Sequence, residues 1–160
     1  WIAGSPVTDY DSPAAAELHF VRPGISKRYT LAGNTLTVSW QFSGLAGQPF
    51  ATVLNLAMPS CDGFLGRYVL ADGSIPAGFG QPLDLSDTEQ LLLEDGVLGG
   101  RLQLRATLAG AIKCRPHQTV SQSEAGFEKI MQSAEVQLSW IIPDDNCHLH
   151  LQLTLESTQP

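Results

Sequence analysis

Two histidines, His148 and His150, are the first residues whose type and spacing could carry chemistry. They lie in the segment NCHLHLQLTLE (residues 146–156), where every second residue from 149 is leucine. Residues two apart on a β-strand share a face, so both imidazoles could reach one cation. A zinc site needs a third or fourth ligand, and Cys147 would point to the opposite face. We interpret the segment as a strand and predict no metal and no cofactor, with this histidine pair as the remaining metal candidates.

The sequence contains no established catalytic motif. The nucleophile-elbow pattern G-x-S-x-G is missing, although a Ser-His-Asp triad is defined by geometry and needs no such motif. Two acidic pairs, Asp144-Asp145 and Glu94-Asp95, fall in turn-like sequence, and adjacent carboxylates rarely converge across a substrate. We therefore predict that the protein is not an enzyme. A histidine-dependent hydrolase is the third-ranked alternative, and it requires at least two of the four histidines to meet in one cleft.

Three cysteines, Cys61, Cys114 and Cys147, are present, and none forms a C-x-x-C pair. Two of them could form a disulfide in three different pairings. Cys61 and Cys114 both lie at the ends of strand-like segments, and a Cys61–Cys114 disulfide is the predicted pairing. The alternative is three buried free thiols in a cytosolic protein.

The composition argues against several classes of partner. The formal net charge is −7 with nine Lys and Arg residues, so the chain lacks the basic surface that holds phosphate backbones or anionic membranes. No apolar run approaches the roughly 20 residues needed to span a bilayer. The chain opens on Trp1 without an initiator Met, from which we expect a processed or trimmed chain. We expect neither nucleic-acid binding nor membrane insertion.

Alternation of apolar and polar residues with a period of two dominates the sequence. The clearest cases are residues 35–43, 101–108, 135–140 and 148–156, with shorter strand candidates at residues 17–21, 26–31, 51–58 and 66–70. Strands with one polar face are typical of antiparallel sheets. The sequence thus predicts an all-β fold, an antiparallel β-sandwich of the Ig-like or a related Greek-key type.

Three segments complete this interpretation. LSDTEQLLLEDG (residues 85–96) has the capping-box spacing of Ser86 and Glu89, which predicts a short helix in a crossover. Residues 120–133 are either a second short helix or a long loop. Residues 143–146, PDDN, favour a tight turn that would make the last two strands a hairpin.

A single domain covering residues 1–160 is expected, with residues 1–16 as a possible N-terminal extension. The extended loop at residues 72–84 and the segment at 120–133 are where binding would be expected, because long loops on β scaffolds commonly carry function. Aromatic side chains near polar loop groups could stack on a sugar. The ligand-binding candidates are Phe79, Tyr68, Tyr10 and Phe127.

Three classes of function follow. The first is a non-catalytic extracytoplasmic sandwich used in assembly or attachment, such as a pilus or fimbria subunit or an adhesin, with a protein partner bound through loops or an open sheet edge. The leucine run after Cys147 is the candidate edge. The second is a secreted or periplasmic module that binds carbohydrate or a small ligand, with glycan as the partner. The third is the hydrolase. Secreted, periplasmic or cell-surface localisation is expected.

Overall fold

The computed structural model describes residues 16–58, 60–123 and 126–157, and within these ranges it contains antiparallel strands and no helix. The all-β antiparallel prediction is therefore confirmed, and the short helices expected in the crossovers are not found there. The strands are β1 (Ala16–Arg22), β2 (Ile25–Ala32), β3 (Thr35–Phe42), β4 (Pro49–Leu56), β5 (Gly66–Val69), β6 (Ala77–Gly78), β7 (Leu83–Asp95), β8 (Gly100–Ser123), β9 (Gly126–Ile141) and β10 (His148–Ser157).

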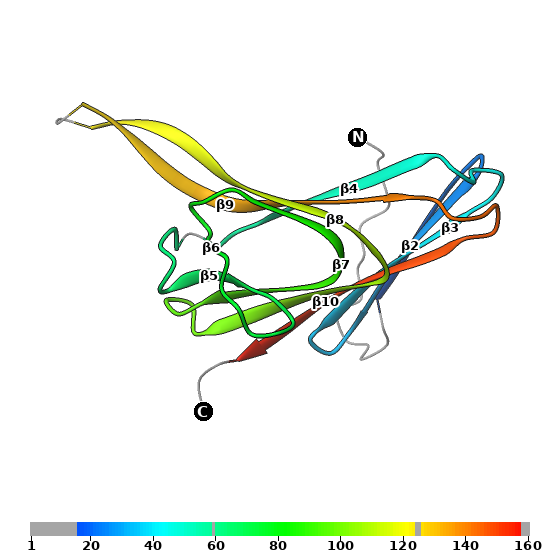
Figure 1. Ribbon diagram of the computed structural model, residues 1–160, viewed down its shortest axis with the longest axis horizontal. Helices are drawn as coiled ribbons and strands as arrows, with labels where there is room; N and C mark the ends of the chain where they lie inside the picture. Colours follow the sequence, from blue (N-terminus) through cyan, green and yellow to red (C-terminus); the bar gives the residue numbers. More distant parts are fainter. Residues whose placement is uncertain (1–15, 59, 124–125, 158–160) are drawn as a thin grey trace.

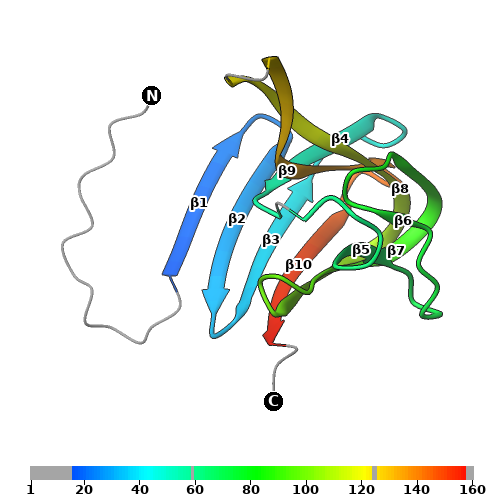
Figure 2. The ribbon, with the colours of Figure 1, turned by 90° about the vertical axis from the view of Figure 1, so that its left-hand side faces the viewer.

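The strands form one continuous sheet that folds over on itself into a sandwich (Figure 1). Its main path runs β1-β2-β3-β10-β8-β7-β5-β6, and β9 joins it through β8 while β4 pairs with β9. The long strand β8 takes part in both layers. Residues 100–106 pair with β10, whereas residues 111–123 pair with β9. Figure 2 shows β1, β2, β3 and β10 side by side, with β4 and β9 crossing over them.

The core lies between the two layers and follows the alternation in the sequence. On β3, Val38, Trp40 and Phe42 are buried, and on β10 the leucines at 149, 151 and 153 are buried. Each set lies on one face of its strand, because successive side chains point to opposite sides. The residues between them, such as Ser39 and Gln152, lie on the outer face of the sheet. The strand interpretation of both segments is confirmed.

The fold passes from one layer to the other at the β7–β8 hairpin. The pairing of these strands shifts register between Leu85 and Thr88 and again between Thr88 and Gln90. Asp87 has a positive φ of 53°, as expected at an irregularity that bends and twists a strand. The strand β7 contains the segment predicted to be a helix. That prediction is wrong because the bulge interrupts the alternation, and pairing with β5 and β8 supersedes the local capping-box signal.

Two other local predictions are also corrected. The strands β9 and β10 do not pair with each other: β9 pairs with β4 and β8, and β10 with β3 and β8. Residues 142–147 therefore connect different parts of the sheet and do not close a hairpin. The leucine run of β10 is a central strand with a neighbour on each side, so it is not an open edge. Within the segment 120–133, residues 120–123 and 126–133 are strand residues of a projecting β8–β9 arm, not a helix or a long loop (Figure 1).

The three cysteines are free in the structure, so the predicted Cys61–Cys114 disulfide is not formed. Cys114 is fully buried on β8, whereas Cys61 is exposed in the connection between β4 and β5. Burial raises the pKa of the Cys114 thiol to about 12, with opposing contributions from Tyr68 and Arg115. Cys114 thus serves as a small core residue, a common use of an unpaired cysteine.

The two layers differ in width, and this difference leaves part of the inner surface uncovered. In the second layer β4 is an outer strand, whereas the first layer continues through β3 to β2 and β1. Inward-facing residues of β1 and β2 consequently remain half exposed, with Leu18 at 59%, Phe20 at 51% and Leu31 at 49%. No helix that could cross a membrane occurs among the described residues. The predicted extension at residues 1–16 lies outside the described residues except for Ala16, and the single-domain prediction stays a prediction.

Candidate functional site

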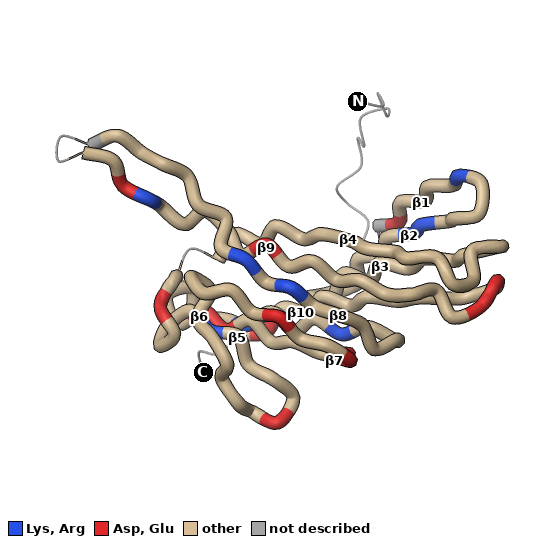
Figure 3. The backbone as a smooth tube through the Cα atoms, turned by 45° about the horizontal axis from the view of Figure 1, so that its top comes forward, with Lys and Arg blue, Asp and Glu red and all other residues tan. Residues whose placement is uncertain are grey.

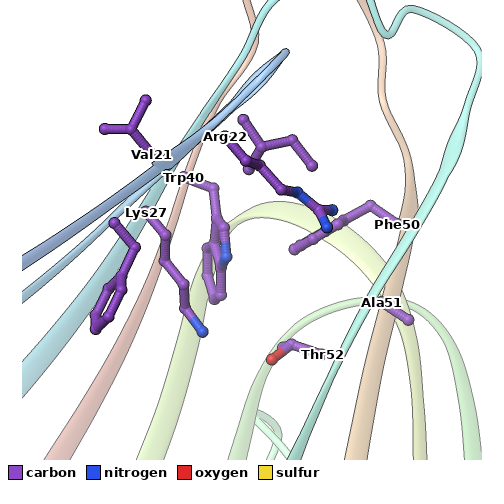
Figure 4. A pocket seen from close by; sticks show the side chains of 9 residues that line it. Val21, Arg22, Lys27, Trp40, Phe50, Ala51 and Thr52 are labelled. Carbon is purple, nitrogen blue, oxygen red and sulfur yellow. The ribbon is translucent and has the colours of Figure 1, made fainter. Parts of the chain in front are cut away.

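A groove opens where β1 and β2 extend beyond the edge of β4. It has a volume of about 280 Å³ and is framed by these strands and by β3 (Figure 4). Its position follows from the unequal layers, because in the described part of the chain β4 pairs only with β9 and the inner face of β2 extends beyond it. Its lining residues are Phe20, Val21, Arg22, Ile25, Lys27, Trp40, Phe50, Ala51 and Thr52.

Phe50 on β4 forms the centre of an aromatic cluster below the groove. Its ring lies 5.4 Å from Trp40 and 4.8 Å from Phe42, both at steep interplanar angles of 66° and 68°. It lies over Trp140 at 6.1 Å in a stacked arrangement of 21°. Edge-to-face and offset contacts of this kind stabilise aromatic pairs. The cluster therefore holds Phe50 in a fixed position at the groove.

Phe20 on β1 forms the opposite wall. Its ring contacts Tyr29 edge-on at 6.0 Å and 84°, while about half of its surface stays exposed. Phe20 is paired with Lys27 across the β1–β2 hairpin, so both side chains lie on the same face of the sheet. An exposed ring held at one edge can offer its face to a ligand.

Lys27 on β2 and Arg22 on β1 are the cations that line the groove, and Figure 3 shows Lys and Arg positions of these strands in blue. The Lys27 Nζ lies 4.6 Å from the centre of the Tyr29 ring and 5.3 Å from that of Trp40, within the range of cation–π attraction. Four Arg–carboxylate ion pairs occur among the described residues, and neither Lys27 nor Arg22 takes part in one. The Lys27 ammonium has three N–H donors and no acceptor. The groove therefore combines aromatic surfaces with donors that suit hydroxyl or anionic oxygens.

The residues proposed from sequence as ligand contacts are not brought together. Tyr68 and Phe79 are fully buried and pack edge-to-face at 5.0 Å, so neither ring is exposed. Tyr68 lies on β5 and Phe79 directly follows β6, in the wall of the sandwich, and a binding role for these two stays a prediction. Phe127 is 78% exposed but lies on the β8–β9 arm, away from β1 and β2 (Figure 1). Tyr10 lies outside the described residues.

His148 and His150 share the outer face of β10, as the alternation indicates. The Nδ1 atom of His150 lies 2.8 Å from Ser39 Oγ on β3, and its backbone N–H donates to Thr107 Oγ1 at 3.0 Å. His148 is exposed beside its cross-strand partner Gln41. Across residues 16–58, 60–123 and 126–157, no group of three or more His, Cys, Asp and Glu side chains could hold a metal ion. His150 thus contributes to the pairing of two strands.

The groove residues were missed by the sequence interpretation, yet one signal was present. In the strand ISKRYT (residues 25–30), Lys27 has the same phase as Ile25 and Tyr29. A lysine in the apolar phase of a strand indicates a position where that face is not closed by the core. The aromatic partner Phe50 comes from β4, and only the tertiary fold brings it near Lys27.

Comparison with known proteins gives one family and several similar folds. The family described as "Alpha-amylase/4-alpha-glucanotransferase, C-terminal" matches residues 10–153. No curated protein sequence matches the chain. The crystal structure of 4-alpha-glucanotransferase from Thermococcus litoralis aligns with a TM-score of 0.55 and 15% identity, over 81% of this chain and 18% of that one. The structure of HI1317 aligns with a TM-score of 0.62 and 13% identity, over 92% of this chain and 62% of that one.

These similarities have a defined extent. At 15% and 13% identity the two structures share a fold with this chain, and they carry no residue-level correspondence. The chain spans less than two thirds of the length of either solved structure. The family match, in contrast, covers most of the sequence, including every strand from β1 to β9.

Proposed function

Because the chain belongs to the family of alpha-amylase/4-alpha-glucanotransferase C-terminal domains, we propose that it is a non-catalytic domain of an α-glucan-active enzyme. In this role it contacts the glucan through the groove between β1, β2 and β4. The observation that carries the proposal is the open aromatic groove, which Phe20, Phe50 and Lys27 line together.

The prediction of a pilus or fimbria subunit, or of an adhesin, is wrong. The family match relates the chain to carbohydrate-active enzymes, and a 4-alpha-glucanotransferase has a similar fold. The features that suggested surface assembly were alternating strands, few charges and the absence of a catalytic motif. These features are common to many sandwiches, because they report how a sheet is buried and say little about its ligand.

The chemistry of the groove supports a carbohydrate ligand. Sugar rings have apolar C–H faces that pack on aromatic side chains, and their hydroxyls need polar partners at the rim. Phe20 and Phe50 offer the apolar surfaces, and Thr52, Lys27 and Arg22 offer hydroxyl and N–H groups.

The same lining supports a binding role over a catalytic one. Glycoside hydrolysis uses two carboxyl groups, one as acid and one as base or nucleophile. The groove is lined by no Asp, Glu, His or Cys among the described residues. In this proposal, the bonds of the glucan are broken or formed in another part of the enzyme, and this domain holds the polymer.

The proposal is tested by measuring binding of maltoheptaose to the 160-residue chain by isothermal titration calorimetry. In Phe20→Ala the stacking surface is lost, and at about 1 kcal/mol for one aromatic contact the Kd should rise about fivefold. Phe20 is half exposed, so this change should leave the core intact. Phe127→Ala is the matched control, since Phe127 is equally aromatic and 78% exposed but lies on the arm.

Two results would count against the proposal. One is the absence of maltoheptaose binding by the wild-type chain. The other is an equal loss in the two variants, or a loss confined to Phe127→Ala, which would move the contact from the groove to the arm and restore Phe127 as the binding residue.

A further inference from the structure

A second surface with the chemistry of a sugar site lies in the connection between β4 and β5. This connection carries Phe64, whose side chain is 80% exposed, the highest value among the large hydrophobic side chains that the structure describes. A single exposed apolar side chain is ordinary on a protein surface. Phe64 is distinguished by the way in which its backbone is held and by the polar groups beside it.

The backbone around Phe64 is held by one carboxylate. Asp62 Oδ1 accepts hydrogen bonds from the backbone N–H groups of Phe64 at 2.9 Å, of Leu65, and of Gly66 at 3.4 Å. These hydrogen bonds keep the pKa of Asp62 below its usual value, and the bond from Leu65 has the largest effect. A hydrogen-bonded turn of this type limits the conformations of the exposed residue it contains.

Close backbone packing holds the same connection against its neighbours. A Cβ atom added at Gly66 would lie 2.2 Å from the Ser60 carbonyl oxygen, and one added at Gly78 would lie 2.6 Å from the Gly63 nitrogen. Only glycine permits backbones to approach this closely. The connection is consequently fixed to β5 and β6, and Phe64 projects from a rigid base.

A hollow of about 230 Å³ lies beside Phe64, lined also by Leu65, Arg67, Glu94, Asp95, Gly96 and Gly100. Arg67 Nε and Nη2 both contact Glu94 Oε2 at 2.9 Å, which leaves Oε1 to accept a further hydrogen bond. Both side chains retain exposed surface, at 36% for Arg67 and 20% for Glu94. This hollow is smaller than the roughly 300–1,000 Å³ pockets of drug-sized ligands, so its size suits a single sugar ring.

Asp95 also lines this hollow. It is 1% exposed, and its Oδ1 accepts hydrogen bonds from Ser60 Oγ at 2.8 Å, from Val97 N at 2.9 Å and from Leu98 N at 3.1 Å. Its Oδ2 is buried and has no partner among the described residues. A buried acceptor without a partner is costly. Because Oδ2 is closed off from solvent, the role of Asp95 is to hold the turn at residues 95–98 through Oδ1, and it is not proposed as a ligand contact.

We infer that Phe64, Arg67 and Glu94 form a second α-glucan contact, which holds one glucosyl ring. The ring stacks on Phe64, and its hydroxyls bond to the Arg67 guanidinium and to Glu94 Oε1. The ligand class rests on the proposed function, but the surface is separate: β5 and the β1–β2 hairpin lie toward opposite ends of the long axis (Figure 1). The two contacts can therefore be tested independently.

The test is a titration of the ¹⁵N-labelled chain with maltotriose, followed by amide chemical shifts. Wild-type protein should show shifts at Phe64–Gly66 and Glu94–Gly96, in addition to those at the groove. Phe64→Ala should abolish the first set, or weaken its Kd at least fivefold, and leave the groove shifts unchanged. Val97→Ala is the matched control, because Val97 is 66% exposed in the next turn but does not line the hollow, and its Kd should stay within twofold.

Each pattern of shifts decides between the two sites. Shifts at the groove without shifts at Phe64–Gly66 overturn this inference and leave the proposed function in place. Shifts at Phe64–Gly66 without shifts at the groove support the inference and overturn the proposed groove. An equal loss in Phe64→Ala and Val97→Ala overturns the inference, because it would show unspecific contact with an apolar patch. The absence of shifts anywhere overturns both.

Discussion

Gly110 lies where β8 passes from one layer to the other, and Gly110→Ala should strongly destabilise the protein. A Cβ atom at this position would lie 2.6 Å from the Ser139 carbonyl oxygen and 2.5 Å from Trp140 Nε1. Carbon–oxygen contacts are usually about 3.3 Å or longer, so one group must move by roughly 0.7 Å. Ser139 belongs to β9, which is paired on both sides and cannot yield freely.

The expected cost follows from this overlap. Overpacking costs about 1–3 kcal/mol, and a clash with paired backbone belongs to the upper part, about 2–3 kcal/mol. The melting temperature of a chain of this size should fall by about 4–12 °C. Trp140 donates to the Leu108 carbonyl oxygen at 3.0 Å and stacks on Phe50. Displacement of its indole should therefore also reach the groove and weaken maltoheptaose binding.

The assay is urea unfolding followed by circular dichroism and tryptophan fluorescence. Gly110→Ala should lower the midpoint without changing the slope m, which reports surface exposed on unfolding. Gly63→Ala is the control, because its added Cβ would meet no atom closer than 3.8 Å, and its stability should change by no more than about 0.5 kcal/mol. If Gly110→Ala proves as stable as Gly63→Ala, the close packing of β8 on β9 described above is refuted.

Two further predictions concern the cysteines. In the native chain one thiol, that of exposed Cys61, should react with Ellman's reagent, and all three thiols should react after unfolding. If no thiol reacts in the native chain and only one reacts after unfolding, the Cys61–Cys114 disulfide is restored. The raised pKa of Cys114, from 9.0 to about 12, stabilises the fold fully below about pH 9, and this contribution is lost as pH rises toward 12. Between pH 8 and 10 the unfolding free energy of the wild-type chain should fall about 1 kcal/mol more than that of Cys114→Ala, as measured by urea titration at each pH. Equal falls would show that Cys114 titrates normally.

The strands could be predicted from the sequence where one face of the strand is buried and the other is exposed to solvent. Trp40 and Leu151 lie in such strands, and the alternation identified both as core residues. The alternation failed to identify β7 as a strand. The bulge at Asp87 shifts which residues point inward, and Leu92 adds an apolar residue between the inward-facing Leu91 and Leu93. Pairing partners were equally hidden, because alternation defines the faces of a strand but not its neighbours.

The candidate sites could not be derived from sequence for a related reason. Phe20 and Phe50 lie on strands that are separated by β2 and β3 in the sequence and by β2, β3, β10, β8 and β9 in the sheet, and only the tertiary fold makes both line one groove. Tyr68 and Phe79 are also aromatic and lie in glycine-rich sequence, yet the fold buries both side chains completely. An aromatic side chain belongs to the core or is available to a ligand depending on which other strands pack over it. The tertiary fold determines this packing, and the local sequence does not show it.

The unequal width of the layers explains why a groove forms here and why its residues are unusual. Among the described residues the second layer ends at β4, so β2 lies at the boundary between the covered and the exposed part of the inner face, and its inward-facing Ile25, Lys27 and Tyr29 are partly buried. A side chain at that boundary must satisfy both surroundings. Lys27 does so by placing its ammonium over the Tyr29 and Trp40 rings, where cation–π attraction stabilises the charge. The same boundary leaves Phe20 half exposed and Phe50 partly buried beside the groove. The glucan-binding role proposed for this face therefore depends on the second layer ending at β4 in the described part of the chain.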